Sequence, residues 1–207
     1  MKNQVELIGF YGSDLTHACS AWTSTSRELT AEKIARVPAL LKMLAENGHH
    51  TPFEKSVLHF LIRVDTATHI HLLKHRIGVS INGESARYKE LMEPSACIPM
   101  DWPSDLADAL AHHFHRSVEL YRDAIVSMEA HGIGRKRAKE SARLFLPYAN
   151  QLTLDVSFNW RSFHHFLGLR NKPDAQVEIQ KIASEMLQIV RLIDNNPFKH
   201  TISAFGY

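Results

Sequence analysis

Apolar residues recur at intervals of three and four positions in four stretches of the chain, a spacing typical of helices with one buried face. The stretches cover residues 34–44, 106–128, 136–144 and 174–194. Gly or Pro follows each stretch within a few residues, and both commonly mark the end of a helix. We therefore predict four helices there and a shorter amphipathic helix from Thr66 onward. The expected buried face of the first helix consists of Ile34, Val37, Leu41 and Leu44.

Alternation of apolar and polar residues predicts strands over residues 58–64 and 152–158, and residues 5–10 form a third candidate strand. The predicted helices do not alternate regularly with these strands. That arrangement is typical of an α+β fold in which helices pack on a small sheet. No internal repeat, low-complexity tract or Pro/Ser-rich linker interrupts the chain, so we expect a single domain over residues 1–207.

The composition fits a globular protein and excludes several other classes. Of the 207 residues, 44% are hydrophobic and 22% are charged, which provides enough apolar residues for a core. Lys and Arg number 24 against 22 Asp and Glu, and the net charge of +2 argues against a nucleic-acid-binding domain. No apolar run is long enough to span a membrane, and the first residues do not resemble a signal peptide. Two cysteines cannot form a disulfide framework, so we expect a cytoplasmic protein.

Familiar catalytic and metal-binding motifs are missing from the sequence. The chain has no G-x-S-x-G, P-loop, H-E-x-x-H or C-x-x-C pattern. His112, His113 and His115 lie off the apolar face of their predicted helix, so we predict an exposed face there and no metal site. Cys19 and Cys97 are expected to be small buried residues rather than nucleophiles.

Residues 74–88 combine three cations, a His, a carboxylate, hydroxyls and an Asn. Arg presents a planar fork that suits phosphate, and the neutral groups add hydrogen-bond donors. The segment is therefore suited to an anionic ligand such as a nucleotide, and a solvated charged loop is the alternative. Further polar residues at the ends of predicted elements, in residues 47–54, at Arg143 and in residues 159–170, favour ligand contacts from several segments.

Four motifs, in this order along the chain, resemble the flavin-dependent thymidylate synthases (the ThyX family). Residues 48–54 match the family's Gly-His-x-Thr-Pro-Phe-Glu without change. Residues 74–76 and 85–88 correspond to its Arg-His-Arg and Ser-x-Arg-Tyr, separated by eight residues, one more than in the family.

The other two motifs lie in the second half of the chain. Residues 142–147 match Ala-Arg-x-x-Leu-Pro, and residues 159–162 match Asn-x-Arg-Ser, with Leu169-Arg170 following. The resemblance extends from about Gly12 to Ala183, which is nearly the whole chain.

The resemblance implies an α+β fold with helices packed on a small, mostly antiparallel sheet. It implies a methyltransferase that converts dUMP to dTMP, with FAD as cofactor, methylenetetrahydrofolate as one-carbon donor and NADPH as reductant. It also implies a homotetramer whose sites are shared between subunits.

The resemblance further assigns ligand contacts to individual residues. Arg170 is the implied catalytic residue, because a guanidinium beside the N3/O4 edge of uracil favours negative charge there and makes C5 nucleophilic. The implied FAD contacts are His49, Thr51, Lys74, His75, Arg76, Asn159, Arg161 and His165. The implied dUMP contacts are His71, Glu84, Ser85, Ala86, Arg87, Arg143 and Arg170.

The chain departs from the family pattern at several of these positions. Lys74 replaces an Arg, which keeps the charge and loses the bidentate fork. His71 stands where Gln is common, and His165 where Asn is common. The extra loop residue places Gly83 where the family has Glu, and Glu84 one position later. Two alternatives stay open: a related enzyme that places another one-carbon group on a pyrimidine nucleotide, or a catalytically silent protein that binds flavin or nucleotide.

Overall fold

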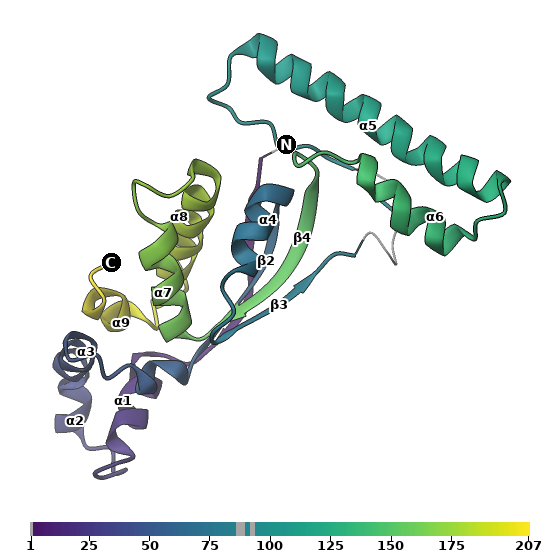
Figure 1. Cartoon of the computed structure of the whole chain (residues 1–207). Helices are drawn as coiled ribbons and strands as arrows, with labels where there is room; N and C mark the ends of the chain where they lie inside the picture. The colour runs from purple at the N-terminus through teal and green to yellow at the C-terminus, as the bar shows by residue number, and fades with distance from the viewer. Residues whose placement is uncertain (1, 86–89, 92–93) are drawn as a thin grey trace. The chain divides into compact units, whose positions relative to one another are not determined.

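The computed structural model describes residues 2–85, 90–91 and 94–207, and its class is α+β, as predicted (Figure 1). The strands are β1 (Gln4–Tyr11), β2 (Val57–Asp65), β3 (Val79–Gly83) and β4 (Gln151–Phe158). The α-helices are α1 (Asp14–Trp22), α2 (Ala31–Ala35), α3 (Val37–Glu46), α4 (Thr66–Leu73), α5 (Ser104–Ala130), α6 (Arg135–Ala142), α7 (Trp160–Arg170), α8 (Val177–Arg191) and α9 (Lys199–Ala204). The short 3₁₀ helices are η1 (Thr51–Glu54) and η2 (Arg143–Phe145).

The four strands form one antiparallel sheet in the order β1-β2-β4-β3. Side-chain pairs mark its register. Asn3 Nδ2 donates to Asp65 Oδ2 at 2.9 Å where β1 meets the end of β2, and His59 pairs with Asp155 between β2 and β4. The three strands expected from the alternating pattern are therefore confirmed, and β3 is added to them at one edge.

One face of the sheet carries the apolar residues that the alternation predicts. Leu58 and Phe60 of β2 are completely buried. Helix α7 packs against this face, since the ring of Phe60 stacks on Phe163 with centroids 5.9 Å apart, and Phe158 lies 5.4 Å from Phe166. Burial of each such side chain contributes about 1.5–3 kcal/mol. These contacts fix the position of α7, which carries several candidate functional residues.

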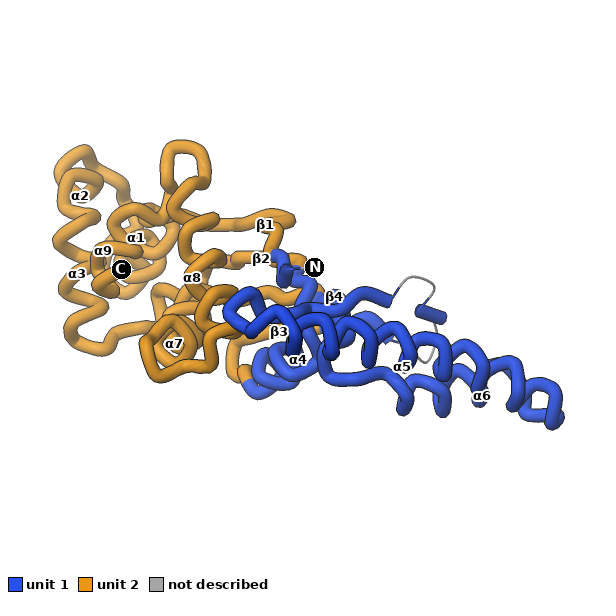
Figure 2. Tube along the Cα trace, turned by 90° about the horizontal axis from the view of Figure 1, so that it is seen from above, with its two compact units in different colours: residues 1–4, 62–74, 82–154 blue, residues 5–61, 75–81, 155–207 orange. Residues whose placement is uncertain are grey.

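The chain divides into two compact units, coloured separately in Figure 2. Unit 1 comprises residues 1–4, 62–74 and 82–154, and unit 2 comprises residues 5–61, 75–81 and 155–207. The boundaries between the units fall within the strands of the sheet, except for the one between Lys74 and His75, which follows α4. The single domain expected from the sequence stays a prediction.

Unit 1 contains the long helix α5, which lies beside α6 (Figure 1). The predicted helix over residues 106–128 is thus confirmed, although Leu106 near its start is 53% exposed. The buried residues shared by α5, α6 and the chain before them are Leu91, Tyr121, Ile125, Ala138 and Ala142.

The helix predicted over residues 34–44 is divided in two. Helix α2 ends at Ala35 and α3 begins at Val37, with Arg36 as the cap between them. Pro38 lies in the first turn of α3, where its ring and its missing N–H prevent a continuous helix. Ile34 is consequently 50% exposed and does not share the buried face of α3, so that part of the prediction is wrong.

The remaining helix predictions hold with shorter bounds. Helix α6 ends at Ala142 before a 3₁₀ turn, and α8 covers residues 177–191 of the predicted 174–194. Helices α1, α7 and α9 have no clear signal in the apolar spacing, because they are short or rich in polar residues. Cys19 and Cys97 are half-buried, not buried as predicted. Within the described residues, no helix combines the length and apolar character needed to cross a bilayer.

Candidate functional site

A cavity of about 580 Å³ lies at the N-terminal end of α7, within unit 2. This volume falls in the usual range of small-molecule sites, about 300–1,000 Å³. Three residues that the sequence predicts as cofactor contacts line it together: Asn159, Arg161 and His165. The sequence analysis assigned no ligand contact to the other lining residues, although Glu54 and Ser162 belong to the matched motifs: His50, Glu54, Ile77, Gly78, Ser162 and His164.

Hydrogen bonds at the first turn of α7 shape this cavity. Asn159 is the N-cap, and its Oδ1 accepts a bond from the Ser162 N–H at 2.8 Å. Ser162 Oγ donates to the carbonyl oxygen of Gly78 at 2.7 Å, which ties the preceding loop to the helix. Gly78 has φ of 67°, and a Cβ there would lie 2.8 Å from Asn159 Nδ2. Only glycine permits this close approach.

The electrostatics of the cavity favour an anionic or hydrogen-bonding ligand. The N-terminus of α7 carries partial positive charge, and Arg161 donates to Glu54 at 2.6 Å through a pair that is partly exposed. Burial, followed by the charges of His50 and His165, lowers the pKa of His164. The His164 imidazole is therefore neutral near pH 7 and offers one donor and one acceptor.

Arg170, the predicted catalytic residue, is held at the other end of α7. Its Nε donates to His75 Nε2 at 3.0 Å. His75 is buried, with its ring 5.0 Å from Phe166 and 6.4 Å from His165. The structure thus brings two predicted residues into direct contact, and this hydrogen bond restricts the orientation of the Arg170 guanidinium.

Two further predicted cofactor contacts, His49 and Thr51, line a different cavity of unit 2, with a volume of about 540 Å³. Helices α1 and α3 supply most of its wall, including Trp22 and Met43. The structure therefore distributes the predicted cofactor contacts of unit 2 over two cavities.

Among the predicted nucleotide contacts of unit 1, His71 has a buried ring nitrogen and Glu84 is hydrogen-bonded to Thr153 of β4. His71 has a buried Nδ1 with no hydrogen-bond partner among the described residues. The main-chain N–H of Glu84 donates to the Thr153 carbonyl oxygen at 2.8 Å, and the Thr153 N–H lies 3.3 Å from Glu84 Oε2. Ser85 beside it is half-buried. Glu84 is therefore fixed against β4, immediately after β3.

Other predicted contacts lie at the surface or beyond the described residues. Exposed side chains are those of Lys74, Arg76 and Arg143. Outside the described residues lie Ala86 and Arg87. His112, His113 and His115 of α5 are exposed, as the sequence predicts.

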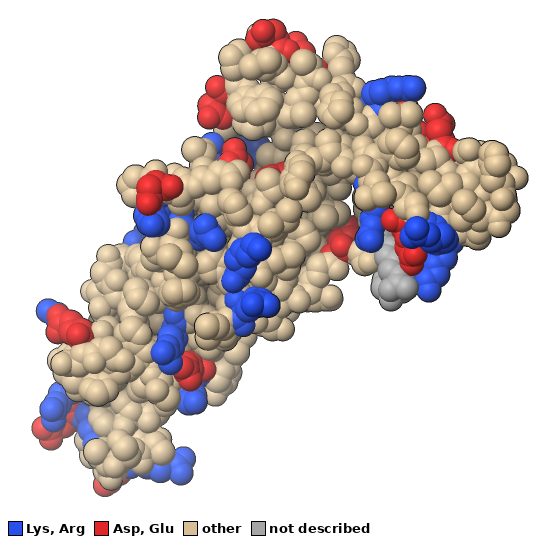
Figure 3. Space-filling view, viewed as in Figure 1, with Lys and Arg blue, Asp and Glu red and all other residues tan. Residues whose placement is uncertain are grey.

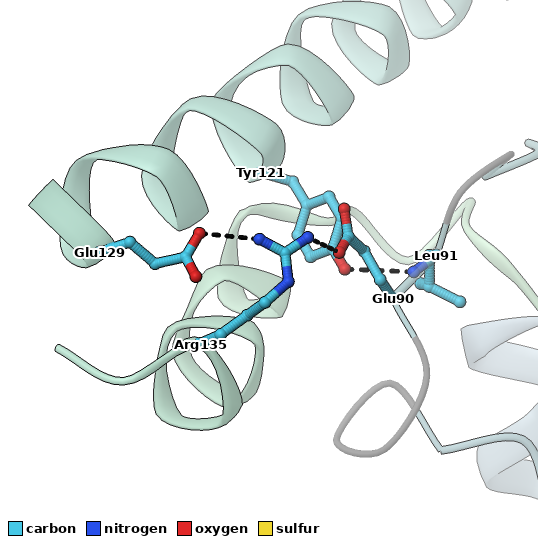
Figure 4. Close-up of polar contacts among 5 residues, drawn as sticks. All are labelled: Glu90, Leu91, Tyr121, Glu129 and Arg135. Atoms are coloured by element: carbon cyan, nitrogen blue, oxygen red, sulfur yellow. Dashed lines mark hydrogen bonds and ion pairs between the residues drawn. The ribbon is translucent and has the colours of Figure 1, made fainter.

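The chain at residues 90–91 is tied to α5 and α6 by polar contacts within unit 1 (Figure 4). Arg135 donates to Glu129 at 2.7 Å and to Glu90 at 2.6 Å, and the charges of Glu129 and then Glu90 raise its pKa. The Tyr121 hydroxyl accepts a bond from the Leu91 N–H at 3.2 Å. These contacts hold Glu90 and Leu91 against α5 and α6.

Charged residues are mixed on the face of the molecule drawn in Figure 3. Acidic side chains neighbour many of the basic ones there, and a few Lys and Arg side chains near the middle of the view have no acidic neighbour on this face. The charges on this face therefore form pairs and small groups, as the near balance of 24 basic and 22 acidic residues would suggest.

Comparison with known proteins identifies relatives along nearly the whole chain. Residues 6–194 match the Thy1 family, described as thymidylate synthase complementing protein. A flavin-dependent thymidylate synthase of Thermotoga neapolitana is 30% identical over 201 residues, covering 92% of this chain and 86% of the relative. One from Pseudothermotoga lettingae is also 30% identical, with coverage of 91% and 85%.

A solved structure agrees with these relatives. The UMP/dUMP methylase PolB from Streptomyces cacaoi, bound with 5-Br dUMP, superimposes with a TM-score of 0.76 at 28% identity and covers 99% of this chain and 94% of its own. The same enzyme bound with 5-Br UMP gives a TM-score of 0.75, covering 99% of this chain and 93% of its own. The chain therefore belongs to the Thy1 family of flavin-dependent thymidylate synthases and is an enzyme of that family.

Proposed function

We propose that this enzyme methylates dUMP to dTMP, with FAD as cofactor, methylenetetrahydrofolate as one-carbon donor and NADPH as reductant. In the balanced reaction, a methylene group and a hydride become the new methyl group at C5 of uracil, and the C5 proton is released. Tetrahydrofolate and NADP⁺ are the other products; the two folate nitrogens that release the methylene group take up two protons, so that the reaction consumes one proton in total. The observation that carries the proposal is the gathering of Asn159, Arg161 and His165 at one cavity beside α7, the helix that also bears Arg170.

The residues around this cavity fit a flavin nucleotide. The helix N-terminus and Arg161 suit a diphosphate group. Asn159 and the imidazoles of His50 and His164 suit the hydrogen-bonding edges of a heteroaromatic ring. The close approach at Gly78 leaves no room for a side chain beside Asn159. When bound, FAD supplies the hydride equivalent that NADPH replenishes.

Arg170 stabilises the charge that develops on the substrate. Its guanidinium, oriented through Nε by His75, favours negative charge at the N3/O4 edge of uracil and so makes C5 more nucleophilic. No covalent attack by the protein is required. This role differs from that of a cysteine nucleophile, and neither Cys19 nor Cys97 belongs to the sites described above.

The nucleotide contacts are assigned to the remaining predicted residues, with Arg87 and Arg143 on the phosphate. The FAD contacts Lys74 and Arg76 are exposed, which fits sites completed by a neighbouring subunit of a homotetramer. We place this enzyme in the cytoplasm, in keeping with a chain of only two cysteines, neither of which is in a disulfide.

A second candidate substrate is UMP. The PolB enzyme is described as a UMP/dUMP methylase and was solved with both 5-bromo nucleotides, and it shares the fold over 99% of this chain. Acceptance of the ribose 2′-hydroxyl is therefore a property to measure for this enzyme alongside dUMP.

Product analysis tests the proposal directly. Purified protein is incubated with FAD, NADPH, methylenetetrahydrofolate and either dUMP or UMP, and the nucleotides are identified by mass spectrometry. We expect dTMP from dUMP, and 5-methyl-UMP if ribose is accepted. A product carrying a different one-carbon group would support the related-enzyme alternative. Protein that binds FAD without turnover would support the silent alternative, and protein that stays colourless with excess FAD would overturn the flavin assignment.

A further inference from the structure

Tyr207 packs against His164, one of the residues that line the cavity at the start of α7. The ring centroids of the two residues lie 5.8 Å apart. The ring of Phe205 lies 4.4 Å from His164 and 5.3 Å from His50. The segment after α9 therefore packs against His50 and His164, two histidines that line the cavity. All of these residues belong to unit 2.

Two polar contacts join Tyr207 to His164. The phenolic oxygen lies 3.0 Å from His164 Nδ1, and the hydroxyl donates to the main-chain carbonyl oxygen of His164 at 3.2 Å. The hydroxyl has one proton, so both contacts are hydrogen bonds only if Nδ1 carries a proton and donates it to the phenolic oxygen. A neutral imidazole protonated at Nδ1 leaves Nε2 as an acceptor.

Burial keeps the Tyr207 hydroxyl protonated and the His164 imidazole neutral, as the two hydrogen bonds require. Burial raises the pKa of Tyr207 to about 12, so the hydroxyl keeps its proton. Burial also lowers the pKa of His164, with smaller contributions from His50 and His165, so its ring is neutral near pH 7. No hydrogen bond to His164 Nε2 is present among the described residues, which leaves that nitrogen available to a ligand.

We propose that Tyr207 is a positioning residue that holds His164 in the Nδ1-protonated form, so that Nε2 accepts a hydrogen bond from a ring N–H of the bound flavin nucleotide. This inference rests on the proposed function for the identity of the ligand. Among the other polar groups of the cavity, Arg161 and the helix N-terminus only donate and the acceptor Glu54 is paired with Arg161, whereas the imidazoles of His50 and His165 can donate or accept. His164 therefore supplies an acceptor that a heteroaromatic N–H requires.

Tyr207→Phe tests the role of the hydroxyl, because it keeps the ring that packs on His164. We expect FAD affinity, measured by fluorescence titration, to fall about threefold to tenfold, the loss typical of one hydrogen bond. The ¹⁵N spectrum of histidine-labelled, flavin-free protein provides a second readout. It should show His164 protonated at Nδ1 in the wild type and a mixture of both tautomers in Tyr207→Phe.

Testing Tyr207→Phe in a His164→Gln protein separates the effect of the hydroxyl on the His164 tautomer from an effect on packing. In His164→Gln, the amide oxygen replaces Nε2 as an acceptor and has no tautomer to fix. Adding Tyr207→Phe to His164→Gln should change FAD affinity less than twofold. Tyr121→Phe removes a hydroxyl from unit 1, where it accepts a bond from Leu91, and should leave FAD affinity unchanged.

The outcomes distinguish this inference from the proposed function. Wild-type protein that binds FAD, with Tyr207→Phe binding it equally well, would overturn the inference and leave the proposed function intact. An Nε2-protonated His164 in the wild-type spectrum would also overturn it. Wild-type protein that binds no FAD would overturn the proposed function, and the spectrum would still decide which nitrogen of His164 carries the proton.

Discussion

The two units hold their candidate residues in different ways. In unit 2, candidate side chains fix one another: Asn159 caps α7 and Ser162 holds Gly78 at the cavity, and His75 holds Arg170 at the other end of α7. In unit 1, Arg143 is exposed, and the polar contacts of Arg135 fix the ends of elements rather than the lining of a cavity (Figure 4). Unit 2 thus has the character of a preorganised site, whereas unit 1 combines Glu84, which is held against β4, with the exposed Arg143.

Replacing Arg170 should produce the largest loss of activity. We expect Arg170→Ala to lower kcat for dTMP formation by about 10²–10³, because it removes the charge that stabilises the developing uracil anion. FAD affinity should change little. Steady-state kinetics and a flavin titration check both values.

Arg116→Ala is the matched control, since Arg116 lies on the exposed side of α5 and pairs only with Glu119 among the described residues. It should turn over like the wild type. Equal activity in Arg170→Ala would show that the assignment of the catalytic residue is wrong.

Acid should destabilise unit 2 through His17, which is completely buried. Its Nδ1 bonds Thr201 Oγ1 at 3.0 Å, and Thr201 in turn bonds Asp14. Burial lowers the pKa of His17 from 6.5 to about 4. Between these values the unfolded chain takes up a proton and the folded chain does not, so stability falls as pH falls from 6.5 to 4, by about 3 kcal/mol in total.

Urea unfolding at several pH values measures this loss. His17→Gln, which cannot take up a proton, should show a shallower decline in the free energy of unfolding over the same range. Parallel slopes for the two proteins would contradict the assignment to His17.

The elements that position the site were only partly predictable from the sequence. The strands β2 and β4 follow directly from their alternating pattern, and the motifs named Asn159, Arg161 and His165 before the fold was known. Helix α7 has no clean apolar spacing, because His164, His165 and Arg161 interrupt it. Tertiary contacts with the sheet, such as Phe163 on Phe60, stabilise the helix instead.

The motifs did not predict which candidate residues contact one another, because those contacts join residues that are far apart in sequence. His164 enters the cavity beside a predicted residue, yet its role depends on Tyr207, 43 positions away. The contact between His75 and Arg170 spans 95 positions. No local pattern encodes such pairs, because they arise only when the helices pack on the sheet.

Gly78→Ala should disrupt the cofactor cavity of unit 2. The added Cβ would lie 2.8 Å from Asn159 Nδ2 at a φ of 67°. We expect a loss of about 2–3 kcal/mol in unfolding free energy, from the backbone conformation and the close contact together. FAD affinity should fall at least tenfold, since the loop can no longer meet α7.

Gly132→Ala separates the effect of the positive φ from the effect of the close contact with Asn159. Gly132 also has a positive φ, 78°, but a Cβ there would meet no other atom within 4 Å among the described residues. It should lose about 1–2 kcal/mol of stability and keep its FAD affinity. If the two variants bind FAD equally well, the contact between Gly78 and Asn159 does not shape the site.

The smallest effect is expected for Tyr121→Phe in unit 1. The buried hydroxyl accepts one bond from the Leu91 N–H, and its loss leaves that donor without this partner, at a cost of about 1 kcal/mol. For a chain of this length, the melting temperature should fall by about 2–4 °C. Because the change lies in unit 1, FAD affinity should stay at the wild-type value. A loss of FAD affinity here would show that the α5–α6 region is energetically coupled to the cofactor cavity, and that the contrast drawn between the two units is wrong.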